Sequence, residues 1–107
     1  MGPCITTRDE IANPQAMDME LRVNGSIRQK GNTNLMRISI AELVAHYSCF
    51  TLNPGDIITT GTIAGSGYFR KDNEKYMLHV DDKIEAEVSG IGILRNHVVQ
   101  DTGQPYA

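Results

Sequence analysis

The sequence has no tryptophan, few aromatic side chains of any kind, two cysteines and no long apolar run. Its longest uninterrupted apolar runs are two or three residues, far short of the roughly 20 residues that cross a bilayer, so we expect no membrane partner. Cys4 and Cys49 are too few for a disulfide framework, which favours free thiols in a reducing cytoplasm. The first residues also lack a basic region followed by an apolar stretch, and we therefore expect no secretory signal.

An excess of basic residues is also missing. The chain carries 10 Lys and Arg against 13 Asp and Glu, a formal net charge of −3, and no basic stretch stands out. Nucleic-acid binding needs a row of cationic side chains that displaces counterions from phosphates. We therefore expect no nucleic-acid partner.

The length of 107 residues fits one domain or a piece of a larger one. Ile, Val, Leu and Phe together number 25 of the 107 residues, which is enough to fold but leaves a thin core. We interpret residues 1–107 as a single partial domain and predict that residues 101–107 form a frayed tail. Marginal stability, or association with a partner, is the expected consequence.

Local patterns predict a mainly β or α+β fold with about five strands and one short helix near residues 39–50. Strict alternation from Met19 to Val23, followed by Asn24-Gly25, predicts a hairpin whose return strand covers residues 26–29. Ser39 and Glu42 have the spacing of a capping box at the start of the helix. Further strands are expected at 57–60, 84–88 and 93–99, and a solvent-facing loop at 70–76.

Most arrangements that could carry chemistry fail on spacing. No glycine-rich stretch completes a phosphate-binding motif, and the histidines and cysteines lack the pairing of a zinc site. His46 and Cys49 lie three residues apart with no third group to orient them, and His46 more readily pairs with Glu42. Asp18 and Glu20 could share a metal ion, but a solvated strand face is the stronger interpretation, as it is for Glu85 and Glu87.

The stretch from Pro54 to Thr62 remains as the one candidate site. It places the hydroxyl of Thr60 next to Gly61, where backbone N–H groups can be exposed at the end of a β-branched segment. Hydroxyl and amide donors can hold a carboxylate without adding charge. Composition alone still favours a structural role, in which the threonines satisfy nearby backbone groups.

Four segments, taken in order, resemble the C-terminal half of the fumarylacetoacetate hydrolase family. They are Gly2 to Ile11, Arg22 to Met36 with its Asn24-Gly25 and Asn32-Thr33-Asn34 motifs, Pro54 to Thr62, and Ser89 to Asn96. Each segment is weak evidence by itself, but their common order over nearly the whole chain is specific. The resemblance implies part of a mixed β-roll and an enzyme that hydrolyses, decarboxylates or isomerises diketo-acid or hydroxymuconate-type substrates.

By this resemblance, Thr60 and Gly61 bind the carboxylate of a small substrate, and Thr33 and Met36 lie near the catalytic pocket. Ile63 and Ser66 depart from the family pattern, in which Pro and Val are usual, and bear on substrate preference. Family members use Mg²⁺ or Mn²⁺ held by carboxylates that precede the part of the fold represented here. We therefore predict no metal ligand and no catalytic residue within this chain, and a homodimer or association with the missing half of the domain.

Two hypotheses of different classes follow. The first is a segment of such an enzyme, inactive by itself, that contributes the carboxylate side of the pocket. The second is a non-catalytic β-module that binds a small carboxylate or acts as an association surface.

Overall fold

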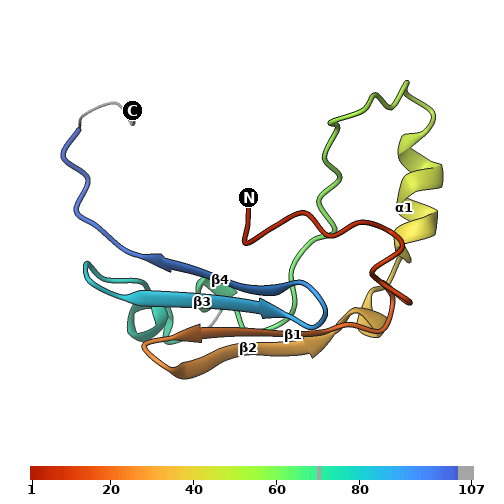
Figure 1. Ribbon diagram of the computed structural model, residues 1–107. Helices are drawn as coiled ribbons and strands as arrows, with labels where there is room; N and C mark the ends of the chain where they lie inside the picture. Colours follow the sequence, from red (N-terminus) through yellow and green to blue (C-terminus); the bar gives the residue numbers. More distant parts are fainter. Residues whose placement is uncertain (70, 104–107) are drawn as a thin grey trace.

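A four-stranded antiparallel sheet forms the base of the molecule (Figure 1). The computed structural model describes residues 1–69 and 71–103. The strands are β1 (Asp18–Val23), β2 (Ser26–Asn32), β3 (Lys83–Val88) and β4 (Gly92–His97), in the spatial order β2-β1-β3-β4. The helical elements are η1 (Thr33–Leu35), α1 (Ile40–Tyr47), η2 (Gly67–Phe69) and η3 (Asn73–Tyr76). The predicted mainly β or α+β class is confirmed, with one α-helix and an open sheet.

The predicted hairpin is confirmed as β1 and β2, with a return strand that extends to Asn32 instead of ending at residue 29. Asn24 and Gly25 have φ angles of 51° and 78°, the left-handed values that a two-residue turn of this kind requires. The Asn24 side chain also joins the turn to the start of β3, because its Oδ1 accepts a hydrogen bond from the Lys83 N–H at 2.9 Å and its Nδ2 donates to Asp82 Oδ1 at 2.7 Å. One turn therefore sets the register of two neighbouring strand pairs.

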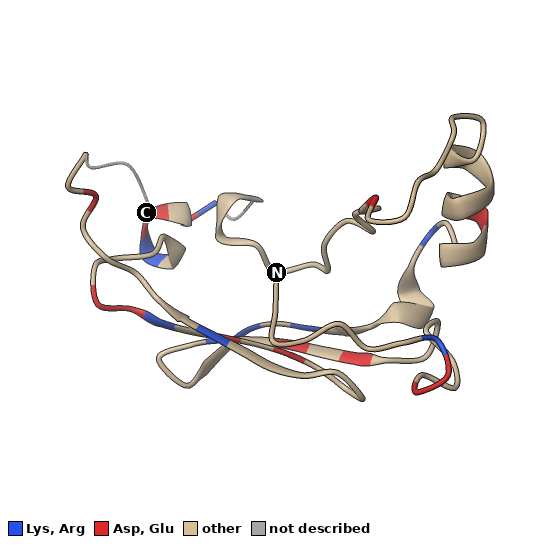
Figure 2. Cartoon of the chain, turned by 45° about the horizontal axis from the view of Figure 1, so that its top comes forward, with Lys and Arg blue, Asp and Glu red and all other residues tan. Residues whose placement is uncertain are grey.

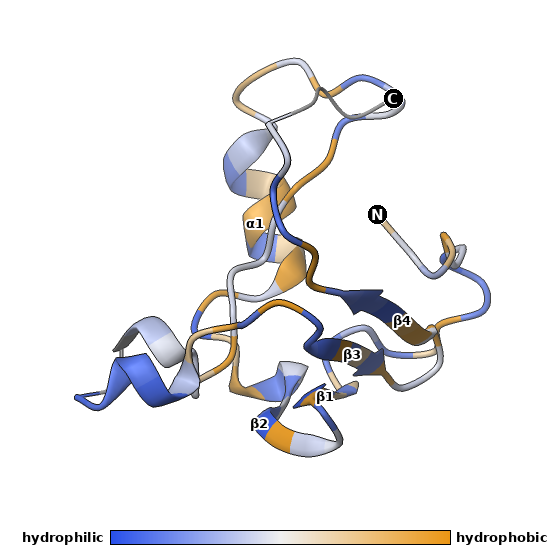
Figure 3. Cartoon of the chain, turned by 90° about the vertical axis from the view of Figure 1, so that its left-hand side faces the viewer, coloured by the Kyte–Doolittle hydropathy of each residue, from blue (hydrophilic) through white to orange (hydrophobic). Residues whose placement is uncertain are grey.

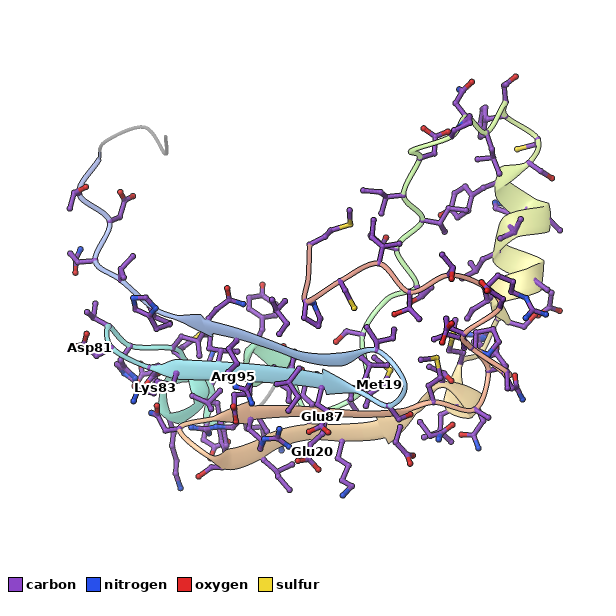
Figure 4. The ribbon with its side chains drawn as sticks, in the orientation of Figure 1. Met19, Glu20, Asp81, Lys83, Glu87 and Arg95 are labelled. Atoms are coloured by element: carbon purple, nitrogen blue, oxygen red, sulfur yellow. The ribbon has the colours of Figure 1, made fainter. Side chains whose placement is uncertain are left out.

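Charged side chains cross-link the outer face of the sheet. Arg22 of β1 donates to Glu20 on its own strand and, on β3, to Glu85 at 3.3 Å and Glu87 at 2.7 Å. Two flanking pairs join Lys30 of β2 to Glu20 at 3.2 Å and Arg95 of β4 to Glu85 at 2.8 Å. Acidic and basic positions lie along the sheet in Figure 2, and Figure 4 labels Glu20, Glu87 and Arg95 on it. The Glu20 side chain is 19% exposed and ion-paired on this charged face, because Arg22 follows two residues later on the same strand and therefore shares its face.

The helix begins where its sequence predicts. Ser39 Oγ accepts from the Glu42 N–H at 3.2 Å, and the Glu42 carboxylate accepts from the Ser39 N–H at 2.8 Å, a complete capping box. The helix ends at Tyr47, so Cys49 lies beyond it. Glu42 bonds to Ser39 rather than to His46, which corrects the predicted pairing: the capping geometry turns the carboxylate toward the helix start.

Three expected elements differ in the structure. Residues 57–60 are not a strand, because they form no backbone hydrogen bonds with any other described segment and a β-branched run cannot form a ladder without a partner. The last strand ends at His97 instead of residue 99, and η3 forms a turn of 3₁₀-helix within the expected loop. Arg70 of that loop, and residues 104–107 of the expected frayed tail, lie outside the described residues.

The core is thin. Among the described residues only two apolar side chains are buried, Met17 at 8% and Val23 at 5% exposure. The accessible surface of 8753 Å² exceeds the roughly 5900 Å² expected for a compact 11.8 kDa protein. The radius of gyration is likewise 16.2 Å against about 13 Å expected. The chain is open because α1 stands away from the sheet (Figure 1), and apolar positions lie outside the sheet as well as in it (Figure 3).

None of the helices in residues 1–69 and 71–103 has the length and hydropathy needed to cross a membrane.

Candidate functional site

A pocket of about 410 Å³ lies between the far end of the β1–β2 hairpin, the start of α1 and the segment that returns from α1 to the sheet. Thr60, Gly61, Thr62 and Ile63 line it from that returning segment. Thr33 and Met36 belong to its lining too, on or directly after η1. The four residues singled out by the resemblance, Thr60, Gly61, Thr33 and Met36, therefore line a single cavity, although they come from two distant parts of the sequence.

The donors of this pocket are accessible. Thr60 and Gly61 are exposed, and Thr60 Oγ1 has no hydrogen-bond partner in the part of the chain that the structure describes. Gly61 has a φ of 90°, a value that favours glycine, and open space lies where a side chain would start. The hydroxyl of Thr60 and the neighbouring backbone N–H groups can donate hydrogen bonds to one anionic group.

Thr33 stabilises the opposite wall of the pocket through hydrogen bonds. Its Oγ1 accepts from the Met17 N–H at 2.8 Å, and its own N–H donates to Met17 O at 2.9 Å. Gln15 continues this support, since its Nε2 donates to Thr33 O at 2.8 Å while its Oε1 accepts from the Ile40 N–H at 3.0 Å. Residues that precede the hairpin thus join η1 to the first turn of α1 and hold this wall of the pocket.

Two residues that bear on the site, one in the pocket wall and one behind it, have no role that the sequence alone indicates. Arg37 lines the pocket, is exposed and forms no ion pair with any described residue, so it is a cation available to a ligand. Its position between Met36 and Ile38 gave no pattern that distinguishes it from an ordinary surface arginine. Gln29 lies beneath the returning segment and bonds to it. It falls within the Arg22 to Met36 segment that carries the resemblance, but its position opposite Leu21 is visible only once the strand register is known.

Several carboxyl groups outside the pocket have lowered pKa values. Hydrogen bonds from Arg22 lower the pKa of Glu20, and those from Arg95 and then Arg22 lower the pKa of Glu85. The His79 N–H and the Asn24 amide lower the pKa of Asp82. These groups stay ionised as structural partners at neutral pH, so none is suited to give or take a proton there.

The described residues offer no centre for a metal ion. No group of three or more His, Cys, Asp or Glu side chains among them is placed to hold one. Asp18 instead accepts from Asn32 Nδ2 at 2.8 Å, and Glu20 bonds to Arg22 and Lys30.

Comparison with known proteins identifies the relatives of this chain. Residues 1–99 match the family Fumarylacetoacetate (FAA) hydrolase C-terminal, and the chain belongs to this family. The mitochondrial oxaloacetate tautomerase Fahd2a of Rattus norvegicus is 42% identical over 100 residues, which are 92% of this chain and 31% of that protein. The chain thus spans about a third of the length of the relatives that it matches.

Solved structures show the same fold. The fumarylacetoacetate hydrolase of psychrophilic Exiguobacterium antarcticum matches 94% of this chain, and 35% of its own, with a TM-score of 0.86 and 39% identity. A maleylpyruvate hydrolase of Sphingobium sp. SYK-6, in complex with manganese(II) and pyruvate, matches 92% of this chain and 34% of its own. The TM-score is 0.78 and the sequence identity 39%. A 2-hydroxyhepta-2,4-diene-1,7-dioate isomerase from Mycobacterium marinum matches 94% of this chain and 36% of its own, with a TM-score of 0.77 and 32% sequence identity. The family therefore includes hydrolases, isomerases and tautomerases.

Proposed function

We propose that this chain supplies the carboxylate-binding wall of the pocket in a fumarylacetoacetate hydrolase-family enzyme that acts on diketo-acid or hydroxymuconate-type substrates. The observation that carries the proposal is the single pocket shared by Thr60, Gly61, Thr33 and Met36. The Thr60 hydroxyl and the N–H groups of Gly61 and Thr62 hold the substrate's carboxylate by donated hydrogen bonds. The bond that reacts, by C–C hydrolysis, decarboxylation or keto–enol isomerisation, then lies beyond this wall, toward groups supplied from outside the chain.

A divalent metal, Mg²⁺ or Mn²⁺, belongs to the proposed complete enzyme and is held by residues outside these 107. The manganese in the maleylpyruvate hydrolase structure supports a metal in the family. Asp18 and Glu20 are engaged in hydrogen bonds to Asn32 and Arg22, which supports metal ligands that come from outside this chain. The cytoplasm remains the predicted compartment, supported by the two free and exposed thiols of Cys4 and Cys49.

Association is the second part of the proposal. The chain exposes about 2800 Å² more surface than a compact protein of its mass. A standard interface covers about 800 Å² on each partner, so one such contact leaves most of the excess uncovered. We propose that the polypeptide present in the relatives but not in this chain covers most of it, and that a homodimer contact covers part of the remainder. This excess also favours the association surface named in the alternative hypothesis.

A chimera tests the enzymatic proposal. Residues of this chain replace the matching 100 residues of the rat oxaloacetate tautomerase, and oxaloacetate tautomerisation is measured with Mg²⁺ or Mn²⁺. The chimera should be active, whereas the 107-residue chain by itself and the rat protein without its matching segment should be inactive. A folded but inactive chimera, or turnover by the isolated chain, would contradict the proposal.

A further inference from the structure

The segment that carries Thr60 and Gly61 has few attachments to the rest of the molecule. Residues 57–66 belong to no helix or strand. Within the described residues, the hydrogen bonds that connect this segment to another element all come from the side chain of Gln29. Its Nε2 donates to Ile63 O at 2.6 Å and lies 3.3 Å from Thr62 Oγ1.

Gln29 stands out by its place on β2. It lies directly opposite Leu21 in the register, so its side chain shares the face of Leu21 rather than that of the charged cross-links. A polar amide on an apolar face needs a hydrogen-bond partner because burial without one is costly. The carbonyl of Ile63 provides that partner, directly above the strand.

Two glycines, Gly31 on β2 and Gly65 on the segment itself, let the segment approach the strand closely. A Cβ on Gly31 would lie 3.2 Å from Ile63 Cγ2, so Ile63 sits on the bare backbone of β2. A Cβ on Gly65 would lie 2.6 Å from Arg28 O, and Gly65 has a φ of 110°. The segment thus crosses β2 at three neighbouring positions, with the Gln29 amide bond between the two glycine contacts.

We propose that Gln29 is a positioning residue for the carboxylate site: its amide holds Thr62 and Ile63 against β2 and so fixes the directions of the Thr60 hydroxyl and the Gly61 N–H. The inference rests on the proposed function for its ligand, but the clamp itself is a property of this chain. A prearranged set of donors binds an anion more tightly than a mobile one because less ordering is needed on binding. Gln29 itself does not touch the ligand.

The test uses the 107-residue chain labelled with ¹⁵N and pyruvate as the probe. Three variants are compared with the unmodified chain: Gln29→Ala, Gln29→Glu, which keeps the shape but replaces the donor by an acceptor, and Lys30→Ala as a control on the opposite face of the same strand. Backbone order parameters of residues 60–65 report the clamp, and pyruvate-dependent shifts of the Gly61 and Thr62 amides report the site.

At pH 7 both Gln29 variants should lower the order parameters of residues 60–65, while those of β1 and β3 stay unchanged. Each should raise the Kd for pyruvate about tenfold, the equivalent of ~1.4 kcal/mol. Lys30→Ala should change neither. Unchanged order parameters and an unchanged Kd in Gln29→Glu would overturn the clamp.

Failure of the proposed function gives a different result. If pyruvate moves no Gly61 or Thr62 resonance in the unmodified chain, the carboxylate site is wrong, and the order parameters still decide the clamp. If pyruvate binds equally well to a chain whose segment has become mobile, the site stands and the positioning role is wrong. A loss of order across β1 and β3 in Gln29→Ala would mean general unfolding and would contradict a local role.

Discussion

The guanidinium of Arg37 gives the pocket a positive charge that its wall of threonine and glycine lacks. The resemblance identified Thr60 and Gly61, because those residues sit in a recognisable motif. Arg37 could not be identified in the same way, and Gln29 lies within the Arg22 to Met36 segment of the resemblance without a role that the sequence indicates. Their relevance depends on which residues line the cavity and on a register shift between Leu21 and Arg22, and neither is encoded in local spacing.

Replacement of Arg37 by Gln should weaken binding of ligands with two carboxylates more than binding of pyruvate. Thr60 and Gly61 hold one carboxylate in the proposal, and Arg37 is available to a second. An exposed ion pair contributes about 0.2–1 kcal/mol, so we expect the Kd for oxaloacetate to rise about threefold. Titration calorimetry with both ligands checks this, with Arg8→Gln as the charge-matched control. An equal loss for both ligands would contradict the role.

At the scale of elements, locally encoded features were predicted well. The Asn24-Gly25 hairpin and the Ser39 capping box depend on residues a few positions apart, and both are present. The strand expected at 57–60 is absent because strand formation depends on a partner that no described segment provides. Ile57 is 63% exposed there, although its sequence is typical of a buried strand.

The hairpin turn should tolerate little change at Gly25. The Cβ that Gly25→Ala adds has no atom within 4 Å, so the loss of stability comes from the backbone conformation, with its φ of 78°. We expect a loss of about 1–2 kcal/mol in unfolding free energy, measured by urea denaturation. Gly25→Asn should lose less, because asparagine tolerates left-handed values. Equal losses for the two variants would argue against a purely conformational cause.

The charged cross-links of the sheet should make stability fall in acid. Glu20, Glu85 and Asp82 have lowered pKa values in the folded chain, so the unfolded chain binds their protons first as the pH falls. Their contribution is complete above the ordinary carboxyl pKa of about 4 and is lost as the pH falls through the lower folded values.

Thermal unfolding between pH 7 and pH 3 measures this loss. Arg22→Met should reduce the melting temperature at pH 7 by about 5 °C and flatten its decline in acid, since two of the three pKa values depend on Arg22. Lys30→Met, which removes only the 70% exposed partner of Glu20, is the control and should have a smaller effect. If the melting temperature falls as steeply with pH in Arg22→Met as in the unmodified chain, the acid sensitivity does not depend on Arg22.

At the scale of the whole molecule, composition alone anticipated the thin core. Twenty-five Ile, Val, Leu and Phe side chains are enough to fold but leave a thin core, and Val23 alone of those in the described residues is buried. The extent of the opening could not be predicted, because it depends on how far α1 stands from the sheet. Exposed Phe50 and Ile57 lie on the α1 side, where residues 47–59 also form a second hollow.

The isolated chain should associate or melt with low cooperativity. Its exposed apolar surface favours contact with another copy when the rest of a family enzyme is absent. Sedimentation velocity at concentrations from about 5 to 200 µM should show a mass that rises with concentration. This range covers dissociation constants typical of weak association. Replacement of both Phe50 and Ile57 by Ser should reduce that rise. A monomer at every concentration with a sharp melt at high temperature would contradict the association proposal.

The central claim is that Thr60 holds the substrate's carboxylate, and the KM for oxaloacetate of the active chimera tests it most directly. Thr60→Ala should raise KM about tenfold, the value of one hydrogen bond to a charged group, with a smaller change in kcat. The neighbouring Thr59→Ala is the matched control, because Thr59 lines the second hollow instead of the pocket. A KM that is the same in Thr60→Ala, Thr59→Ala and the unmodified chimera would contradict the account.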